Sequence, residues 1–215
     1  MVEVERFINS RFNSNTYIIA HPEHDNVWIV DPGDTDDVFE WMRVHSKTTV
    51  TEVLLTHSHF DHMYGINEVI SRFPSVKVYV ANEYGKEALS DAKKNGSKYT
   101  EEGPIVIKDN SRIVFYSKEV VLWDDERINV LYTPGHSDDS VCLYVGRMLF
   151  TGDTLIEDVR TVTKLKTGSV EKLSETVSPL KKLQGNGLYI YPGHGNPFEM
   201  DKYNLQRMLL RKGDD

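Results

Sequence analysis

The segment THSHFDH (56–62) places three histidines and an aspartate within six residues, directly after an apolar run that is typical of a β-strand. Side chains in an extended segment alternate between two faces, so His57 and His59 can point to the same side. Asp61 and His62 follow where the chain is expected to turn into a helix. Imidazole and carboxylate groups suit zinc, manganese and iron. The segment therefore predicts a metal site, with donors for two ions.

One short segment rarely completes the ligand shells of two metals, so further ligands are expected elsewhere in the chain. The sequences TPGHSDDS, LFTGDT and IYPGHGNP contain His136, Asp153 and His194, each following an apolar run that is expected to be a strand. A glycine stands beside each of these residues and permits a sharp turn at the end of the strand. We expect these three side chains to complete the metal site.

Hydrophobic periodicity predicts alternating strands and helices, with strands clustered in the middle of the chain. The predicted strands cover 16–20, 27–33, 50–56, 76–81 and 187–191, with several more between 105 and 153. The predicted helices cover 35–46, 66–73, 83–94 and 169–184, and a last helix is expected from about 199. This pattern favours two sheets covered by helices on their outer faces, in a single domain over residues 1–215.

Composition excludes several classes of protein. The net charge of −8 argues against nucleic acid as a partner, because phosphate backbones are bound by an excess of Lys and Arg. No apolar run approaches the roughly 18 residues of a membrane-spanning helix. Cys142 is the only cysteine, which excludes an intrachain disulfide and a Cys-rich zinc site. The first residues lack the pattern of a secretory signal, so we expect a cytoplasmic enzyme with a small-molecule substrate and no membrane partner.

The motifs THSHFDH, TPGHSDDS, FTGDT and YPGHG, in this order, resemble those of the metallo-β-lactamase-fold hydrolases, and their wording is most similar to the glyoxalase II branch. The resemblance runs from about residue 15 to 197. It implies an α/β (α+β) fold, a four-layer αβ/βα sandwich, with a dinuclear metal site at one edge. Carried over position by position, the first metal would be bound by His57, His59 and His136, the second by Asp61, His62 and His194, and both by Asp153.

The resemblance also implies a reaction. Two divalent ions, zinc by expectation and iron or manganese as alternatives, would share a hydroxide that attacks a thioester or related ester. Asp61 would also orient the water or take its proton. Thr56, Ser58 and Asp138 are candidates for holding the histidines in one tautomer. The segment after Asp153 reads LIEDVRTVTK and lacks the basic, glycine-rich wording of the glyoxalase II branch, which leaves the thiol part of the substrate open.

Two alternatives belong to other functional classes. A persulfide dioxygenase-like enzyme of the same fold would bind a single iron through His57, His136 and Asp153, two histidines and one carboxylate. A non-catalytic binding protein would be expected to have lost part of the ligand set, and every expected ligand is present in the sequence.

Overall fold

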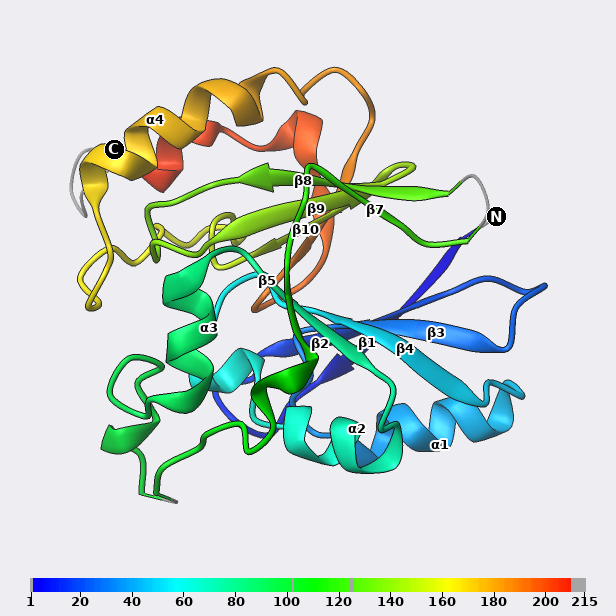
Figure 1. The fold of residues 1–215 in the computed structure, drawn as a ribbon. Coiled ribbons are helices and arrows are strands. Elements are labelled where there is room, and N and C mark those ends of the chain that lie inside the picture. Colours follow the sequence, from blue (N-terminus) through cyan, green and yellow to red (C-terminus); the bar gives the residue numbers. More distant parts are fainter. Residues whose placement is uncertain (1, 102, 124–125, 210–215) are drawn as a thin grey trace. The chain divides into compact units, whose positions relative to one another are not determined.

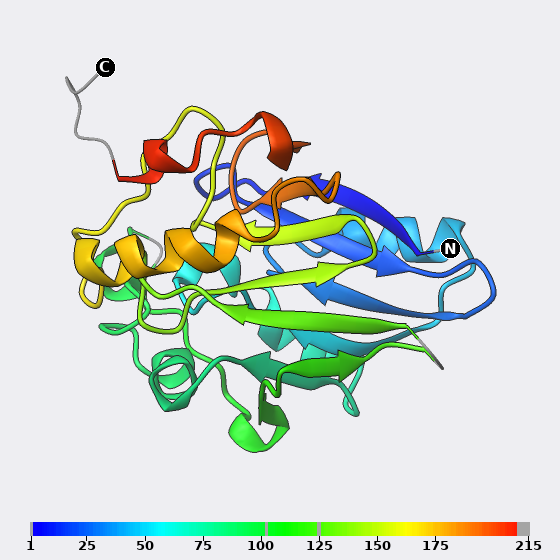
Figure 2. The same cartoon turned by 90° about the horizontal axis from the view of Figure 1, so that it is seen from above.

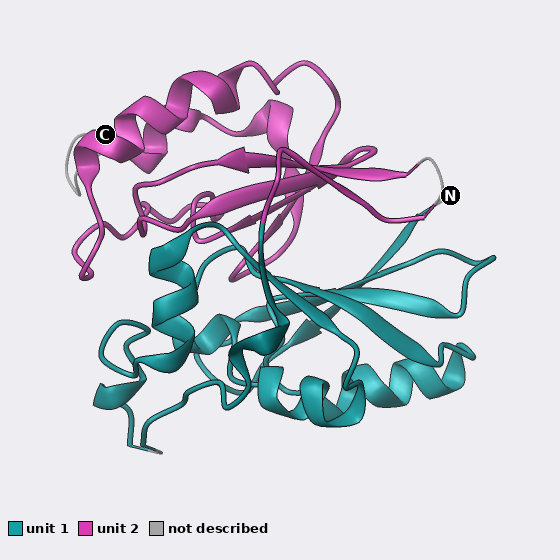
Figure 3. Cartoon of the chain, viewed as in Figure 1, with its two compact units in different colours: residues 1–115 teal, residues 116–215 magenta. Residues whose placement is uncertain are grey.

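The structure is a computed structural model that describes residues 2–101, 103–123 and 126–209 of the chain. The chain forms two compact units, residues 1–115 and 116–215 (Figure 3). Each unit has its own six-stranded mixed sheet and its own apolar core. Among the described residues, no helix has the length and apolar character that crossing a membrane requires.

The first unit is built on a sheet with the strand order β1-β2-β3-β4-β5-β6 (Figure 1). Its strands are β1 (Glu3–Ile8), β2 (Asn15–Ala20), β3 (Asn26–Val30), β4 (Thr49–Leu54), β5 (Lys77–Val80) and β6 (Ile113–Phe115). The pairs β1–β2 and β2–β3 are antiparallel, whereas β3–β4, β4–β5 and β5–β6 are parallel. Because parallel strands end at the same edge, the segments that leave β3 and β4 begin next to one another.

Helices supply the crossovers that parallel strands require. They are α1 (Asp36–Val44), α2 (Ile66–Arg72) and α3 (Glu83–Ser90). Helices α1 and α2 lie side by side on one face of the first sheet (Figure 1). Val38 and Met42 of α1 and Ile66 and Val69 of α2 are buried with strand residues such as Ile29 in one core. Their spacing of three or four residues puts each pair on one face of its helix.

The second unit has the strand order β12-β11-β10-β9-β8-β7. Its strands are β7 (Glu119–Val121), β8 (Arg127–Tyr132), β9 (Val141–Val145), β10 (Met148–Gly152), β11 (Tyr189–Pro192) and β12 (Phe198–Glu199). Neighbours are antiparallel except β10 and β11, which are parallel. Strands β8, β10 and β11 therefore run in the same direction and end at the same edge of the sheet.

Helix α4 (Val170–Lys181) covers one face of the second sheet (Figure 2). Its first turn is capped by the Ser169 hydroxyl, which accepts a hydrogen bond from the Lys172 backbone N–H at 3.2 Å. Leu173 is buried in the core of this unit. Pro179 lies inside the helix, and the helix ends two residues beyond it, so the missing N–H disturbs only the last turn.

Most predicted elements are confirmed, and the differences lie at element ends and at the N-terminus. The helix predicted over 83–94 ends at Ser90, because Asp91 adopts an extended conformation. Strand β1 (Glu3–Ile8) was not predicted. It is the edge strand of its sheet, and its side chains are exposed or half-buried, so it lacks the apolar run that identifies the central strands.

The helix predicted from about residue 199 is wrong over the part of the chain that the structure describes, and residues 210–215 lie outside it. This segment instead forms β12 and two 3₁₀ turns, Met200–Lys202 and Leu205–Met208. The Gln184 side chain donates hydrogen bonds to the carbonyls of Met200 and Tyr203 at 3.2 and 2.9 Å. These tertiary bonds replace the regular helical pattern that the charged sequence suggested.

Replacing either of two glycines in the second unit is expected to lower the free energy of unfolding, but by different amounts. Gly135 has φ +152°, and an added Cβ would stand 2.6 Å from the Leu173 Cβ, whereas Gly146 has φ +56° and open space around it. We expect Gly135→Ala to lower the free energy of unfolding by roughly 2–4 kcal/mol and Gly146→Ala by only about 1 kcal/mol. Thermal and denaturant unfolding of both variants measures the difference. Equal losses would contradict the close packing described for Gly135.

Candidate metal centre

The histidine-rich segment of the first unit follows β4 and contains a 3₁₀ turn over Phe60–His62. The rings of His57 and His59 meet edge to face with centroids 4.7 Å apart, and the rings of His57 and His62 are 4.3 Å apart. His57 and His62 are buried. The extended start and tight turn of this segment therefore gather three imidazoles in one place, as the sequence predicted.

Asp31, at the end of β3, organises these histidines through its buried carboxylate. Its Oδ1 accepts a hydrogen bond from the Thr56 N–H at 2.8 Å, and its Oδ2 accepts one from the Thr56 hydroxyl at 2.6 Å. His62 Nδ1 lies 3.0 Å from the same Oδ2. The Thr56 oxygen lies 3.1 Å from Nδ1 of His57. One carboxylate thus fixes His62 directly and His57 through Thr56.

These contacts determine which nitrogen of each histidine ring carries the proton. A carboxylate only accepts hydrogen bonds, so Nδ1 of His62 carries the proton and donates to Asp31. The Thr56 hydroxyl gives its single proton to Asp31, so its oxygen accepts the proton on Nδ1 of His57. In the neutral form of both rings the lone pair then lies on Nε2, and neutral imidazole is the form that binds a metal ion.

Asp61 lies beside His62 within the 3₁₀ turn. Its Oδ2 is 3.7 Å from Nε2 of His62, and its side chain is 14% exposed. The Ser14 hydroxyl donates to the Asp61 backbone carbonyl at 2.7 Å and ties the turn to the start of β2. The Asp61 carboxylate therefore lies beside Nε2 of His62, whereas the other ring nitrogen, Nδ1, contacts Asp31.

In the second unit, His136, Asp153 and His194 follow β8, β10 and β11, the three strands that end at one edge of the sheet. Oδ2 of Asp153 lies 3.5 Å from Nε2 of His136, and Oδ1 lies 3.5 Å from Nε2 of His194. Nδ1 of His136 is 2.8 Å from the Val162 carbonyl, which only accepts, so in the neutral ring the lone pair again lies on Nε2. The structure thus brings these predicted ligands together around one carboxylate.

The donor set suits divalent metal binding. Imidazole and carboxylate groups are the ligands that zinc, iron and manganese take from proteins. The Asp31 and Val162 contacts supply the outer hydrogen bonds that metal-binding histidines usually make. In the first unit Asp31, His57 and His62 alone already form a group whose ligand-type atoms lie within 4.8 Å of one another. The residues therefore fit the metal ions that the sequence predicted.

The role of Asp31 was not predicted from the sequence. Asp31 fell only within the predicted strand over 27–33, although it directly follows a strand that pairs in parallel with the strand before Thr56. Thr56 contacts His57 as expected. Asp138 forms an ion pair with Lys172 at 2.5 Å, and Ser58 is buried.

The chain matches known proteins over most of its length. The family model described as the metallo-beta-lactamase superfamily matches residues 9–194, and the match runs through both units. The chain is 26% identical over 172 residues to a hydroxyacylglutathione hydrolase of Pseudoalteromonas translucida and 29% identical over 174 residues to one of Idiomarina loihiensis. Each alignment covers 79% of this chain but only 57% and 56% of the relative, so the chain spans little more than half the length of these enzymes.

Solved structures share the fold. The B3 metallo-beta-lactamase BLEG-1 is similar with a TM-score of 0.81 and 25% identity, over 92% of this chain and 94% of that one. ETHE1 from Myxococcus xanthus is similar with a TM-score of 0.68 and 18% identity, over 96% and 88% of the two chains. The predicted α/β fold class of the metallo-β-lactamase type is confirmed. By its sequence match and its fold, the chain belongs to the metallo-β-lactamase superfamily.

Proposed function

We propose that the protein is a metal-dependent hydrolase that binds two divalent ions, with zinc as the expected metal. The observation that carries this proposal is the orientation of the histidine rings, since contacts at Nδ1 put the lone pair of the neutral ring on Nε2 in His57, His62 and His136. A purely structural cluster would not require the same nitrogen to be available in each ring. The proposed ligands are His57, His59, Asp61, His62, His136, Asp153 and His194.

Asp153 is proposed to serve both ions. Its two carboxylate oxygens face two different histidines, His136 and His194, each at 3.5 Å. In our assignment His136 joins His57 and His59 at one ion, and His194 joins Asp61 and His62 at the other. With one oxygen toward His136 and the other toward His194, the Asp153 carboxylate would supply an oxygen ligand to each ion. The family match, which runs through both units, supports this joining of the two halves within one domain.

The chain's own residues prepare the site for hydrolysis. Divalent ions bound there would act as Lewis acids and lower the pKa of water toward neutrality. Asp31 and Thr56 hold two of the histidines in the tautomer that binds metal. Asp61, beside His62 and partly exposed, would orient a water molecule or accept its proton at a carboxylate oxygen.

A thioester or related ester is the proposed substrate class. The two hydroxyacylglutathione hydrolases support this choice, although the chain spans only 57% and 56% of their lengths. The segment after Asp153 reads LIEDVRTVTK, and it leaves the thiol part of the substrate open. A small-molecule substrate and a cytoplasmic location stay predictions of the sequence.

Replacing the shared carboxylate tests the proposed ligand set. We expect Asp153→Ala to lower hydrolysis of the best substrate by at least about 100-fold, because both groups of ligands lose an oxygen. The measurement is kcat/KM on a panel of thioesters, lactones and β-lactams, with near-UV circular dichroism to show that the variant is folded. Asp37→Ala, at an exposed site in the first turn of α1, is the control and should keep full activity. Full activity of the Asp153 variant would exclude the proposed centre.

Asp31→Asn tests the hydrogen bonds behind the histidines. Asparagine tolerates the φ of +50° at this position and keeps the oxygen that faces the Thr56 N–H. It places an N–H₂ group where Oδ2 accepts from His62, which favours the wrong tautomer of that ring. We expect metal affinity to fall by about 10- to 100-fold, measured by competition with a chelating dye.

The matched control for this variant is Asp37→Asn, which should bind metal like the wild type. Thermal unfolding in the absence of metal separates a loss of affinity from a loss of folded protein. A variant that is less stable but binds metal with unchanged affinity would show that Asp31 supports only the fold.

A further inference from the structure

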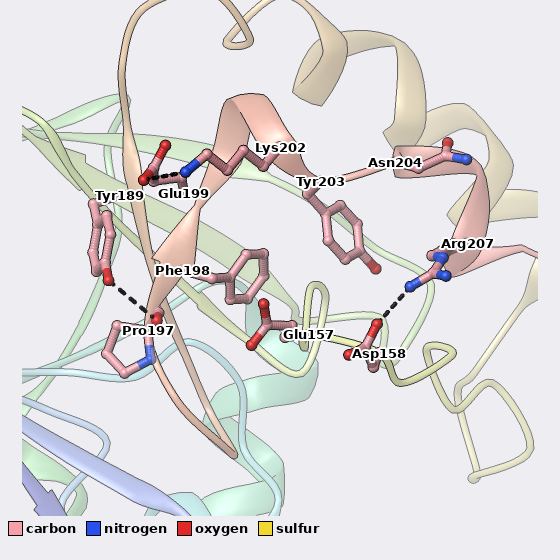
Figure 4. Close-up of a pocket in the computed structure, with 10 residues that line it drawn as sticks. All are labelled: Glu157, Asp158, Tyr189, Pro197, Phe198, Glu199, Lys202, Tyr203, Asn204 and Arg207. Atoms are coloured by element: carbon pink, nitrogen blue, oxygen red, sulfur yellow. Dashed lines mark hydrogen bonds and ion pairs between the residues drawn. The ribbon is translucent and has the colours of Figure 1, made fainter.

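The second unit contains a pocket of about 630 Å³ that includes none of the proposed metal ligands (Figure 4). Its walls come from the turn at Glu157 and Asp158, from β12 and from the 3₁₀ turns that follow β12. We call it the β12 pocket. Its volume lies within the range of about 300–1,000 Å³ that is usual for small-molecule sites.

Tyr203 provides a buried polar atom in this pocket. The residue is only 8% exposed, and its ring packs against Phe198 with centroids 5.3 Å apart. Within the described part of the chain, the hydroxyl oxygen has no hydrogen-bond partner. Figure 4 shows this hydroxyl directed toward the side of the pocket formed by Asp158 and Arg207. Burial raises the pKa of Tyr203 to about 12, so the group keeps its proton and can both donate and accept. Buried hydroxyls normally find a partner, which points to a ligand.

The charges around the pocket favour a cation. Arg207 pairs with Asp158 at 2.5 Å and Lys202 pairs with Glu199 at 2.8 Å, so both basic side chains are neutralised by neighbouring carboxylates. Glu157 is exposed at the same turn and forms no hydrogen bond or ion pair with the described residues. The pocket therefore has one carboxylate in excess, and it would repel phosphates and other anions.

Aromatic rings form much of the remaining wall. Phe198, Tyr203 and Tyr189 line the pocket, and the Tyr189 ring is held by a hydrogen bond from its hydroxyl to the Pro197 carbonyl at 3.3 Å. Tyr189 is 40% exposed, so part of the residue is accessible to a ligand. Aromatic faces attract ammonium groups and pack well against flat apolar bodies.

We propose that the β12 pocket binds a small organic amine through its ammonium group and an aromatic or aliphatic body. The ammonium pairs with Glu157, the body packs against Phe198 and Tyr189, and Tyr203 forms a hydrogen bond with the ligand. This site does not depend on the proposed hydrolase activity, because no metal ligand contributes to it.

The pocket is nevertheless connected to the candidate metal centre through the chain. Glu157 lies four residues after Asp153, and Pro197 lies three residues after His194. An added Cβ on Gly195 would lie 4.0 Å from Ile156, so the two segments lie close together within this unit. The amine has two sources, a separate ligand or the amino group of the substrate itself, and these are distinguished below by competition.

The test is titration of the full-length protein with 2-phenylethylamine, followed by NMR chemical shifts and calorimetry. The matched probes are 2-phenylethanol, which lacks the charge, and phenylacetate, which reverses it. We expect the amine to bind and to shift resonances of residues 157–159 and 197–207, with the alcohol binding weakly and the anion not at all. Binding of phenylacetate as tight as that of the amine, or shifts confined to other parts of the chain, would overturn the proposal.

Variants separate the two polar contacts. Glu157→Gln should weaken amine binding by about tenfold and Tyr203→Phe by about threefold or more. Glu175→Gln, an exposed carboxamide substitution on α4, is the control and should bind like the wild type. Because Glu157 is exposed, its variant is expected to fold normally, and unchanged amine affinity in it would reject the assigned role.

A kinetic measurement then assigns the source of the amine. Competitive inhibition of thioester hydrolysis by 2-phenylethylamine would show that the pocket binds the amino end of the substrate. Unchanged hydrolysis at saturating amine would show a separate ligand. The binding experiments need neither metal nor activity, so a failure of the proposed hydrolase leaves their outcome intact.

Discussion

The direction of the strands determines where the proposed metal ligands and their supporting residues lie in each sheet. In the first sheet β3 and β4 are parallel neighbours, so Asp31 and Thr56 emerge at the same edge and bond to one another. In the second sheet β8, β10 and β11 run in one direction and each ends just before a proposed ligand. Glycines beside these residues let the chain turn at once, which keeps each side chain at the rim of its sheet.

The buried carboxylate of Asp31 determines the tautomers of His57 and His62. Without it, either nitrogen of His57 and His62 could carry the proton, and only one of the two neutral tautomers of each ring has its lone pair on Nε2. The carboxylate satisfies the Thr56 N–H, the Thr56 hydroxyl and the His62 ring at once. The cost of burying its charge is offset by these three donors. Asp31, which is not a metal ligand in our proposal, thus determines which nitrogen of His57 and His62 carries the proton.

The sequence predicted the fold class correctly, because the class depends on patterns within short segments, and short segments also indicated the proposed metal ligands. One segment contains four of the proposed ligands, His57, His59, Asp61 and His62. Each of the three other proposed ligands follows a strand and a turn that contains glycine. The role of Asp31 could not be obtained in this way, since it rests on a pairing of two strands separated by a helix. The same limit explains the wrong C-terminal helix, where Gln184 bonds to carbonyls 16 and 19 residues away. The β12 pocket depends on three separate segments and has no sequence motif.

The central claim, a centre of two divalent ions in one chain, is tested most directly by metal content. Protein would be produced with both zinc and iron available, and its metals counted by elemental analysis per chain. Our account predicts about two divalent ions, mostly zinc or a mixture. About one iron per chain would favour the mononuclear dioxygenase-like alternative and would contradict the shared role of Asp153. No bound metal, in protein that also takes up none from solution, would contradict the metal centre altogether.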